Sequence, residues 1–406
     1  MSRYVFEAVH VLDFSWVGVG PIVTKYLADN GAEVIRIESA ARPDVLRIAP
    51  PWKDGLPGIN YSQFFASFNT SKKSVTLDLN QPKARELALR LVPWADVIGE
   101  SFTPKAMRKW GMDYEQLKKI KPELIMFSTC MQGQTGPNAM YPGFGQLAAA
   151  LSGFYYISGY GPSDPPSPPY GAYSDFVAPR LLGAAVIAAL DYRRRTGKGQ
   201  YIDMSQYEAA LHNLAPAIID YFATGRVLGP HGNRSQRFAP HGAYRCRDEE
   251  GAERWIAIAV AGDQEWRAML AVLGDPACDS KFATVAGRLA HFEALDESVS
   301  RLVRDREAGA LTTELQAAGV AAYPVQNCMD LHQDENLEAF GFWNWLEHKE
   351  MGHCVYEGLQ HRMSRTPGEL RSAGPVLGQH TDEVLTGMLG LSAAEIEQLR
   401  NERVVF

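Results

Sequence analysis

The chain has 406 residues, which is too many for one ordinary hydrophobic core and enough for two domains or one elaborated domain. Apolar residues make up 46% and charged residues 21%, which is typical of a globular soluble protein, and the net charge of −7 counts against a nucleic-acid or membrane-surface partner. The longest apolar run, residues 181–190, is too short to span a bilayer.

The first half of the chain alternates strand and helix patterns. Runs of apolar and β-branched residues predict strands, and apolar residues at helical spacing predict the helices between them. The predicted elements are a strand at 9–14, a helix at 21–29, strands at 34–38 and 74–79, a helix at 83–92, and strands at 96–99 and 124–128. Strands separated by helices imply an α/β fold with a mostly parallel sheet and helices on both faces.

The second half begins with a loop rich in proline, serine and glycine at 161–170. The helix predicted at 177–194 is apolar on nearly all sides, which is typical of a core or an intersubunit interface. A short strand at 201–204, a candidate linker at 225–240, a smaller α/β unit opening with a strand at 255–260, an irregular tail from 331, and helices at 383–389 and 393–401 follow.

Common cofactor and nucleophile motifs are incomplete or absent. Gly18-Val19-Gly20, with Glu38 ending the next strand, resembles a dinucleotide-binding fingerprint, but the third glycine would fall at Val23. We therefore expect no NAD, although a helix N-terminus there could bind a phosphate. The sequence has no HExxH, no Cys/His cluster with zinc spacing and no GxSxG, so we expect neither a metal nor a serine nucleophile.

The cysteines and the N-terminus indicate a reducing compartment. The five cysteines lack CxxC spacing, which favours free thiols, and the first ten residues lack the features of a signal peptide. The cysteines are Cys130, Cys246, Cys278, Cys328 and Cys354. We expect a cytoplasmic protein.

Asp175 is the most informative carboxylate. It follows a glycine-containing loop and precedes the long apolar helix, so it lies at or just before a helix N-terminus, where the dipole and free N–H groups favour an anion. Position alone leaves two readings open, an N-cap or a catalytic carboxylate, and the N-cap is the commoner.

Several segments together resemble the class III CoA-transferase family, which includes formyl-CoA, carnitine and benzylsuccinate CoA-transferases. The segments are VLDF at 11–14, Gly20-Pro21, LADNGAEVIRIE at 27–38, NTSKKS at 69–74, GQTGP at 133–137, Asp175, RRRTGKGQ at 193–200, and GPVLGQHT at 374–381. The similarity covers nearly the whole chain in the right order, and the ordered set is strongly specific.

This resemblance implies a Rossmann-like large domain over 1–215, a linker and small α/β domain over 216–330, and a segment at 331–406 that returns to the large domain. Two chains would interlock like links, as a homodimer or as a heteromer with a related subunit. The family's nucleophile falls on Asp175. Its CoA-contacting positions fall on Gly18, Val19, Asn69, Lys72, Phe102, Thr103, Lys105, Arg108 and Lys109. Four of these, Lys72, Lys105, Arg108 and Lys109, are cations available for the CoA phosphates.

The implied activity is transfer of CoA from an acyl-CoA, such as succinyl-CoA, to a free carboxylic acid through an aspartyl intermediate. Some family members carry glutamine where this chain has Gly18, and the glycine-rich lid of formyl-CoA transferases would fall near 237–242, which is not glycine-rich. Space left by Gly18, with Trp16 and Tyr173 near, would suit a bulky or aromatic acid such as benzylsuccinate.

Two alternatives remain open. A 2-methylacyl-CoA racemase shares the fold, but its histidine would fall near Phe144, which cannot exchange a proton. A non-catalytic CoA-binding subunit of a heteromeric transferase is the second alternative, and the presence of Asp175 favours the active role over it.

Overall fold

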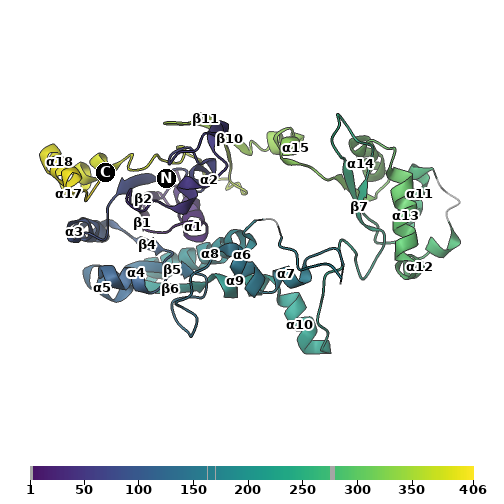
Figure 1. Ribbon diagram of the computed structural model, residues 1–406, viewed down its shortest axis with the longest axis horizontal. Coiled ribbons are helices and arrows are strands. Elements are labelled where there is room, and N and C mark those ends of the chain that lie inside the picture. The colour runs from purple at the N-terminus through teal and green to yellow at the C-terminus, as the bar shows by residue number, and fades with distance from the viewer. Residues whose placement is uncertain (1–2, 162, 170, 275–278) are drawn as a thin grey trace. The chain divides into compact units, whose positions relative to one another are not determined.

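The computed structural model describes residues 3–161, 163–169, 171–274 and 279–406. The chain divides into two compact units (Figure 1). The large unit comprises Met1–Tyr155, Pro168–Leu228 and Asn336–Phe406, and the small unit comprises Tyr156–Ser167 and Gly229–Glu335. Cys278 and two residues of the predicted loop, Pro162 and Tyr170, lie outside the described residues; the other four cysteines are free thiols.

The large unit contains a six-stranded sheet, a hairpin and most of the helices. Its strands are β1 His10–Asp13, β2 Glu33–Glu38, β3 Lys73–Thr76, β4 Val97–Glu100, β5 Ile125–Cys130, β6 Gln200–Ser205, β10 Trp343–His348 and β11 Gly352–Glu357. Its helices are α1 Val19–Asp29, α2 Gln63–Ser67, α3 Pro82–Leu91, α4 Lys105–Trp110, α5 Tyr114–Ile120, α6 Gly145–Leu151, α8 Tyr173–Thr196, α9 Gln206–Asn213, α10 Ala215–Thr224, α17 Thr381–Leu389 and α18 Ala393–Asn401. Short helices α7 Phe154–Ile157 and α16 Glu335–Ala339 span points where the chain passes from one unit to the other.

The six-stranded sheet confirms the predicted α/β fold. Its order is β3-β2-β1-β4-β5-β6, and every neighbouring pair is parallel. Successive side chains of a strand point to opposite faces. Val11 of β1 therefore packs with α1 and α8 on one face, whereas Leu12 packs with α3 on the other. Two cores with helices on both sides result, as the sequence pattern predicts.

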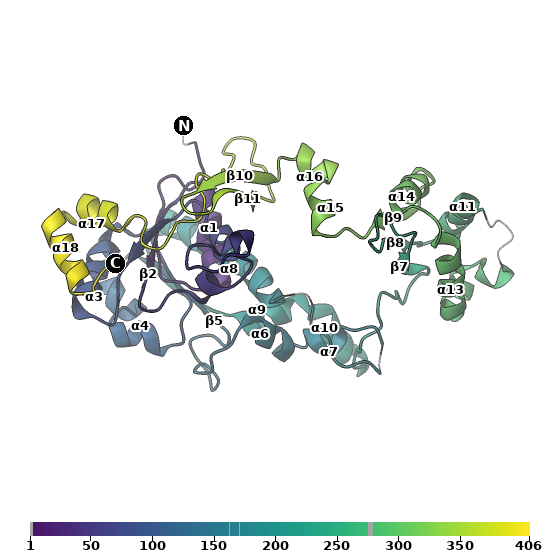
Figure 2. The same ribbon diagram turned by 45° about the horizontal axis from the view of Figure 1, so that its top comes forward.

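Helix α8 is the central helix of one face of this sheet. It packs against α1, α6 and α9 (Figure 2). By length and composition alone, its 24 residues could cross a membrane. In this fold, however, its Ala178, Leu182 and Val186 are fully buried against the sheet. The core therefore explains the apolar residues on this face of α8, whereas others, such as Phe176 and Ile187, are exposed.

The C-terminal segment completes the large unit. Helix α17 packs against α3 and β3, with α18 beside it (Figure 1). The backbone N–H of Ser74 donates to Nδ1 of His380 over 3.1 Å. The tail from 331, predicted to be irregular, instead contains the antiparallel hairpin β10–β11, whose strands pair over six residues each. Its strands carry apolar residues on the face that packs on Ala66, a long-range contact that a local pattern does not reveal.

The small unit has its own sheet and core. Its elements are β7 His241–Arg245, β8 Trp255–Ala259, β9 Ala321–Pro324, α11 Asp263–Leu273, α12 Val285–Ala290, α13 Phe292–Val303, α14 Ala308–Ala317 and α15 Cys328–His332. The strands form an antiparallel sheet in the order β7-β8-β9. Trp266 and Leu295, from helices α11 and α13, are buried in its core.

Candidate active site

A cleft of about 220 Å³ opens at the carboxyl ends of the parallel strands in the large unit. The strand order reverses direction between β1 and β4, and such a switch point is where open parallel sheets bind ligands. The cleft is lined by Trp16, Val17, Gly18, Val19, Ser101, Phe102, Thr103, Thr129, Cys130, Met131, Tyr141, Pro142, Gly143, Phe144, Gly145, Asp175 and Gln206. Five of the predicted site residues meet here: Gly18, Val19, Phe102, Thr103 and Asp175.

Asp175 lies in the first turn of α8 and faces two glycines. A Cβ atom at Gly18 would lie 3.0 Å from Cβ and 3.2 Å from Oδ2 of Asp175. A Cβ atom at Gly145 would lie 2.6 Å from both Cγ and Oδ1 of Asp175. Only glycine backbones therefore approach this carboxylate so closely. The sequence predicted free space for a substrate at Gly18. That prediction is wrong, because the side chain of Asp175 fills the space.

A hydrogen-bonded chain behind the cleft holds the Asp175 carboxylate. Nε2 of Gln206 donates to Oδ1 of Asp175 and, over 3.0 Å, to Oγ of Ser174. Ser174 in turn donates to the carbonyl of Gly145 over 2.8 Å. Burial raises the pKa of Asp175 to about 6, while the Gln206 hydrogen bond works in the opposite direction. The carboxylate is thus more basic than an ordinary aspartate, yet still ionised at neutral pH.

The loop between β1 and α1 brings Gly18 and Val19 to the cleft. Val17 has a φ of 62°, a left-handed conformation that is rare and strained for a β-branched residue. Its N–H donates to Oδ2 of Asp44 over 3.0 Å, and the N–H of Trp16 donates to Oγ of Ser101 over 2.6 Å. Side chains from two other segments therefore fix the loop in this conformation.

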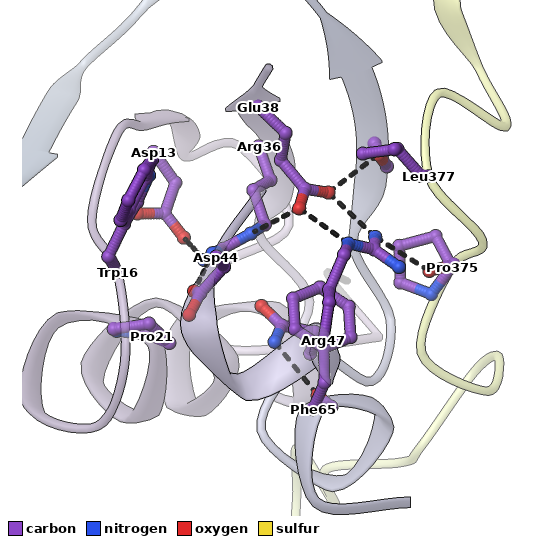
Figure 3. Close-up of polar contacts among 12 residues, drawn as sticks. Asp13, Trp16, Pro21, Arg36, Glu38, Asp44, Arg47, Phe65, Pro375 and Leu377 are labelled. Atoms are coloured by element: carbon purple, nitrogen blue, oxygen red, sulfur yellow. Dashed lines mark hydrogen bonds and ion pairs between the residues drawn. The ribbon is translucent and has the colours of Figure 1, made fainter. Parts of the chain in front are cut away.

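Below the loop lies a network of buried charges (Figure 3). Arg36, fully buried, pairs with Asp44 at 2.5 Å and faces Glu38 at 3.6 Å and Asp13 at 3.8 Å. Arg47 binds Glu38 with two hydrogen bonds of 2.7 and 2.8 Å and donates to the carbonyl of Pro375. None of these residues lines the cleft; the Asp44 carboxylate connects the network to the loop through the N–H of Val17.

Lys72 and Asn69 belong to this buried network and not to the cleft. The Lys72 ammonium donates to Asp13, Asn69 and the Pro21 carbonyl at 2.9 to 3.2 Å, and its side chain has no exposed surface. Burial alone would raise the pKa of Asp13, but the charges of Lys72 and Arg36 lower it. Lys72 therefore neutralises Asp13 inside the protein. The prediction that it is available to bind a CoA phosphate is not supported, because its ammonium is buried.

The other predicted cations lie on the surface of α4, directly after the cleft wall. Lys105, Arg108 and Lys109 are exposed, and none forms an ion pair with another described residue. Phe102, at the start of this segment, contacts Trp16 and Trp110 edge-to-face at 5.6 and 5.5 Å. An aromatic wall thus leads from the cleft to three uncompensated positive charges.

Two polar residues, Gln206 in the cleft and Glu100 next to its lining residue Ser101, were missed from the sequence. Gln206 is the first residue of α9, and its position directly after β6 is the signal that could have placed it at the same sheet edge as Asp175. Glu100 ends β4, and its Oε2 accepts from the N–H of Phe102 over 2.6 Å. Burial raises the pKa of Glu100 to about 7.

The cleft does not favour proton exchange by a second base. Phe144 lines it at the position expected for the racemase histidine, and no histidine is among its described lining residues. The described residues also include no cluster of three potential metal ligands.

Comparison with known proteins gives a consistent result. A family model described as CoA-transferase family III matches residues 6–381. The chain is 30% identical over 402 residues to the succinyl-CoA–L-malate CoA-transferase beta subunit of Chloroflexus aurantiacus, covering 98% of this chain and 97% of that one. It is 30% identical over 385 residues to the succinate–glutarate CoA-transferase of Agrobacterium fabrum, covering 93% and 94%. A crystal structure of a CAIB/BAIF family protein from Brucella suis superposes with a TM-score of 0.86 at 29% identity, covering 95% of this chain and all of that one.

Proposed function

This chain belongs to CoA-transferase family III and is a CoA-transferase, and we propose that it moves CoA from an acyl-CoA to a free carboxylic acid through a covalent intermediate on Asp175. The observation that carries the proposal is the Asp175 carboxylate itself. It stands in a cleft at the ligand-binding edge of the sheet, approached by glycine backbones and held by Gln206.

The proposed reaction begins with attack of an Asp175 oxygen on the thioester carbonyl. The C–S bond breaks, giving a mixed anhydride and the CoA thiolate. The thiolate then attacks Cγ of Asp175, the anhydride bond to Cγ breaks, and the donor acid leaves. The resulting aspartyl-CoA thioester reacts with the acceptor carboxylate by the same steps in reverse. Because an aspartate at pKa about 6 is already ionised at neutral pH, no general base is required.

The raised pKa of Asp175 suits this chemistry. An ordinary carboxylate is about 4 to 5 pKa units less basic than a thiolate, so the first displacement is uphill by roughly 6 kcal/mol. Raising the pKa of Asp175 from 3.8 to about 6 removes roughly half of that difference in basicity. Burial thus makes the carboxylate a stronger nucleophile, and CoA kept in the cleft makes the second step effectively intramolecular.

For the substrates, we infer a dicarboxylic acid acceptor and succinyl-CoA as donor. Relatives at 30% identity are named for malate with succinyl-CoA and for succinate with glutarate. Trp16, Tyr141 and Phe144 line the cleft with aromatic surface. This surface favours an acceptor with an apolar or aromatic substituent, such as benzylsuccinate.

We also infer that the chain works as a homodimer or with a related subunit, in the cytoplasm, where its free thiols remain reduced. Large apolar side chains are exposed on helices α6, α8 and α10, whereas isolated soluble proteins seldom expose many together. They include Leu147, Leu151, Ile187, Ile219 and Phe222. A mutually interlocked pair of chains would cover such surfaces, and the relative from Chloroflexus aurantiacus is itself named a beta subunit.

The α4 cations are proposed to bind the CoA phosphates. Replacing Lys105, Arg108 and Lys109 together by alanine is expected to raise KM for acyl-CoA about tenfold at low salt, with kcat changed little, because exposed charges contribute to binding and not to the chemical step. Steady-state kinetics at low and high ionic strength would measure this, since salt screens exposed charges.

A double variant on the next helix, Lys118→Ala with Lys119→Ala, is the matched control, because it removes exposed cations from α5, whereas the α4 cations directly follow the cleft-lining residues Phe102 and Thr103. Equal KM values for the two variants would contradict the assignment.

The test of the function is intact-protein mass spectrometry after mixing with succinyl-CoA, followed by hydroxylamine or borohydride treatment and peptide mapping. We expect a CoA-sized or hydroxamate adduct on the peptide that contains Asp175. Absence of an adduct with a panel of acyl-CoAs, together with deuterium exchange at the α-carbon of a branched acyl-CoA, would replace the transferase mechanism by a racemase.

A further inference from the structure

Gln206 has an orientation that its neighbours determine. Its side chain is 6% exposed, and Nε2 lies within hydrogen-bond reach of both Ser174 and Asp175. The Ser174 hydroxyl proton is committed to the carbonyl of Gly145, so Oγ can only accept from Gln206. The amide must therefore present its NH₂ group, and its second N–H points at Oδ1 of Asp175.

The two oxygens of Asp175 are consequently different. Oδ1 accepts the Gln206 hydrogen bond and lies on the Gly145 side, where a Cβ would come within 2.6 Å. Oδ2 lies on the side of Gly18, which lines the cleft, and accepts no hydrogen bond from any described residue. Oδ2 thus keeps its lone pairs for a substrate, whereas Oδ1 is tied to the protein.

We propose that Gln206 is a second catalytic residue, whose amide stabilises negative charge on Oδ1 each time the carbonyl carbon of the aspartyl intermediate is attacked. This inference rests on the proposed function. It assigns Oδ2 as the nucleophile and Oδ1 as the oxygen that stays on the enzyme through the first half-reaction.

The bonds balance as follows. Oδ2 bonds to the acyl carbon, and the thiolate leaves. The thiolate then bonds to Cγ, and the C–O double bond electrons move onto Oδ1, which becomes an oxyanion beside Nε2. When the carbonyl re-forms, the Cγ–Oδ2 bond breaks and Oδ2 departs in the donor carboxylate. Gln206 donates to Oδ1 in the carboxylate, in the tetrahedral species and in the thioester, and a fixed donor gains strength as charge develops.

The same hydrogen bond has an effect on pH dependence. It favours the ionised form of Asp175 and so opposes the effect of burial. Among the described residues, the groups in contact with the carboxylate are the backbones of Gly18, the N-cap of α1, and of Gly145 in α6, and the neutral amide of Gln206 in α9. We expect kcat/KM of the wild type to rise with pH through about 6, since only the ionised carboxylate attacks.

The experiment compares two variants. Gln206→Met keeps the size of the side chain but removes the hydrogen-bond donor, and Gln206→Asn keeps the amide but moves it away from Oδ1 of Asp175, because its side chain is shorter. Removal of an oxyanion donor lowers rates about 100-fold or more. We expect Gln206→Met to slow formation of the aspartyl-CoA thioester in rapid-quench single turnovers by about 100-fold, and Gln206→Asn to slow it by about 10-fold. CoA affinity by calorimetry should stay within about twofold, and the pH midpoint of kcat/KM should move upward in Gln206→Met.

Gln63→Met is the matched control, because its amide also donates inside the large unit, to the carbonyl of Val355 over 2.9 Å, and lies outside the cleft lining. A Gln206→Met enzyme whose rate is within threefold of wild type, with an unchanged pH midpoint, would overturn the inference while the wild-type adduct still supports the function. If Gln206→Met does not fold, an unslowed Gln206→Asn enzyme overturns the inference equally. A wild type that forms no adduct overturns the function itself, and the role of Gln206 with it.

Discussion

The Asp175→Asn enzyme is expected to lose CoA transfer by a factor on the order of 10⁴ or more, because a carboxamide is not a nucleophile towards a thioester. Asparagine has nearly the same size and keeps an oxygen that can accept the Gln206 hydrogen bond, so the cleft geometry is retained. Kinetics with succinyl-CoA and a dicarboxylate acceptor would measure the loss.

The same variant should be at least as stable as the wild type. Because the folded-state pKa of Asp175 is raised, the folded protein binds a proton more tightly than the unfolded chain, and stability falls as the pH rises from about 4 to about 6. Asparagine does not ionise, so this decrease in stability is absent from Asp175→Asn. Urea unfolding at pH 4 and pH 7 should therefore show a smaller decline for Asp175→Asn than for the wild type.

The control for Asp175→Asn is Asp191→Asn on the same helix. Asp191 is exposed and pairs only with the nearby Arg194 and Arg195 among the described residues, so its loss should change stability by less than about 1 kcal/mol and leave transfer intact. Substantial CoA transfer by Asp175→Asn would refute the assignment of Asp175 as the nucleophile. If Asp191→Asn were also inactive, the loss of activity could not be attributed to Asp175 in particular.

Replacing Arg47 by methionine should lower the free energy of unfolding by about 3 to 5 kcal/mol, a large share of the roughly 5 to 15 kcal/mol that stabilises a typical domain. The variant would leave the Glu38 carboxylate buried without its two Arg47 hydrogen bonds (Figure 3). The guanidinium also lies 3.7 Å from the Phe65 ring centroid and binds the Pro375 carbonyl, so the C-terminal segment would lose a contact as well.

The pH dependence separates this electrostatic effect from lost packing. Burial alone would raise the pKa of Glu38, but Arg47, with smaller contributions from Arg36 and Ser74, lowers it to about 2. The stabilisation is therefore present above the unfolded-state pKa of about 4.5 and is lost as the pH falls towards about 2. Without Arg47, Glu38 can protonate at a higher pH, and the protein then no longer has the cost of burying an ionised carboxylate. The difference between wild type and Arg47→Met, measured by urea unfolding, should shrink between pH 6 and pH 3.

Adding Glu38→Gln to Arg47→Met should recover part of the stability, because it neutralises a buried carboxylate that has lost its closest cation and keeps Arg36 at 3.6 Å. Lys83→Met is the surface comparison: Lys83 pairs with Glu402 at 2.5 Å but is half exposed, and its loss should cost less than about 1 kcal/mol. If Arg47→Met and Lys83→Met lowered the free energy of unfolding equally, burial would not explain the effect of Arg47.

By itself the sequence determined the α/β fold, the family, and the place of Asp175 at the start of the long apolar helix. These features depend on local patterns: alternating strand residues, helical spacing, and ordered motifs along one chain. The strands predicted at 9–14 and 124–128 appear as β1 and β5 because their apolar runs fill the two sides of a covered sheet.

Only the tertiary structure decided which polar groups meet. Lys72 follows Asn69 in a motif that the family resemblance associates with CoA, yet its ammonium is buried against Asp13, 59 residues earlier in the chain. Gln206 bonds to Asp175 across 31 residues, and Gly18 lacks a side chain because Asp175 occupies that volume. Whether a charge is solvated or paired, and whether a glycine leaves space or a neighbour fills it, depends on long-range packing. Spacing along the sequence does not determine the pairing of a charge or the filling of space at a glycine. Both depend on distances that are established only when the sheet brings separate strand ends to one edge.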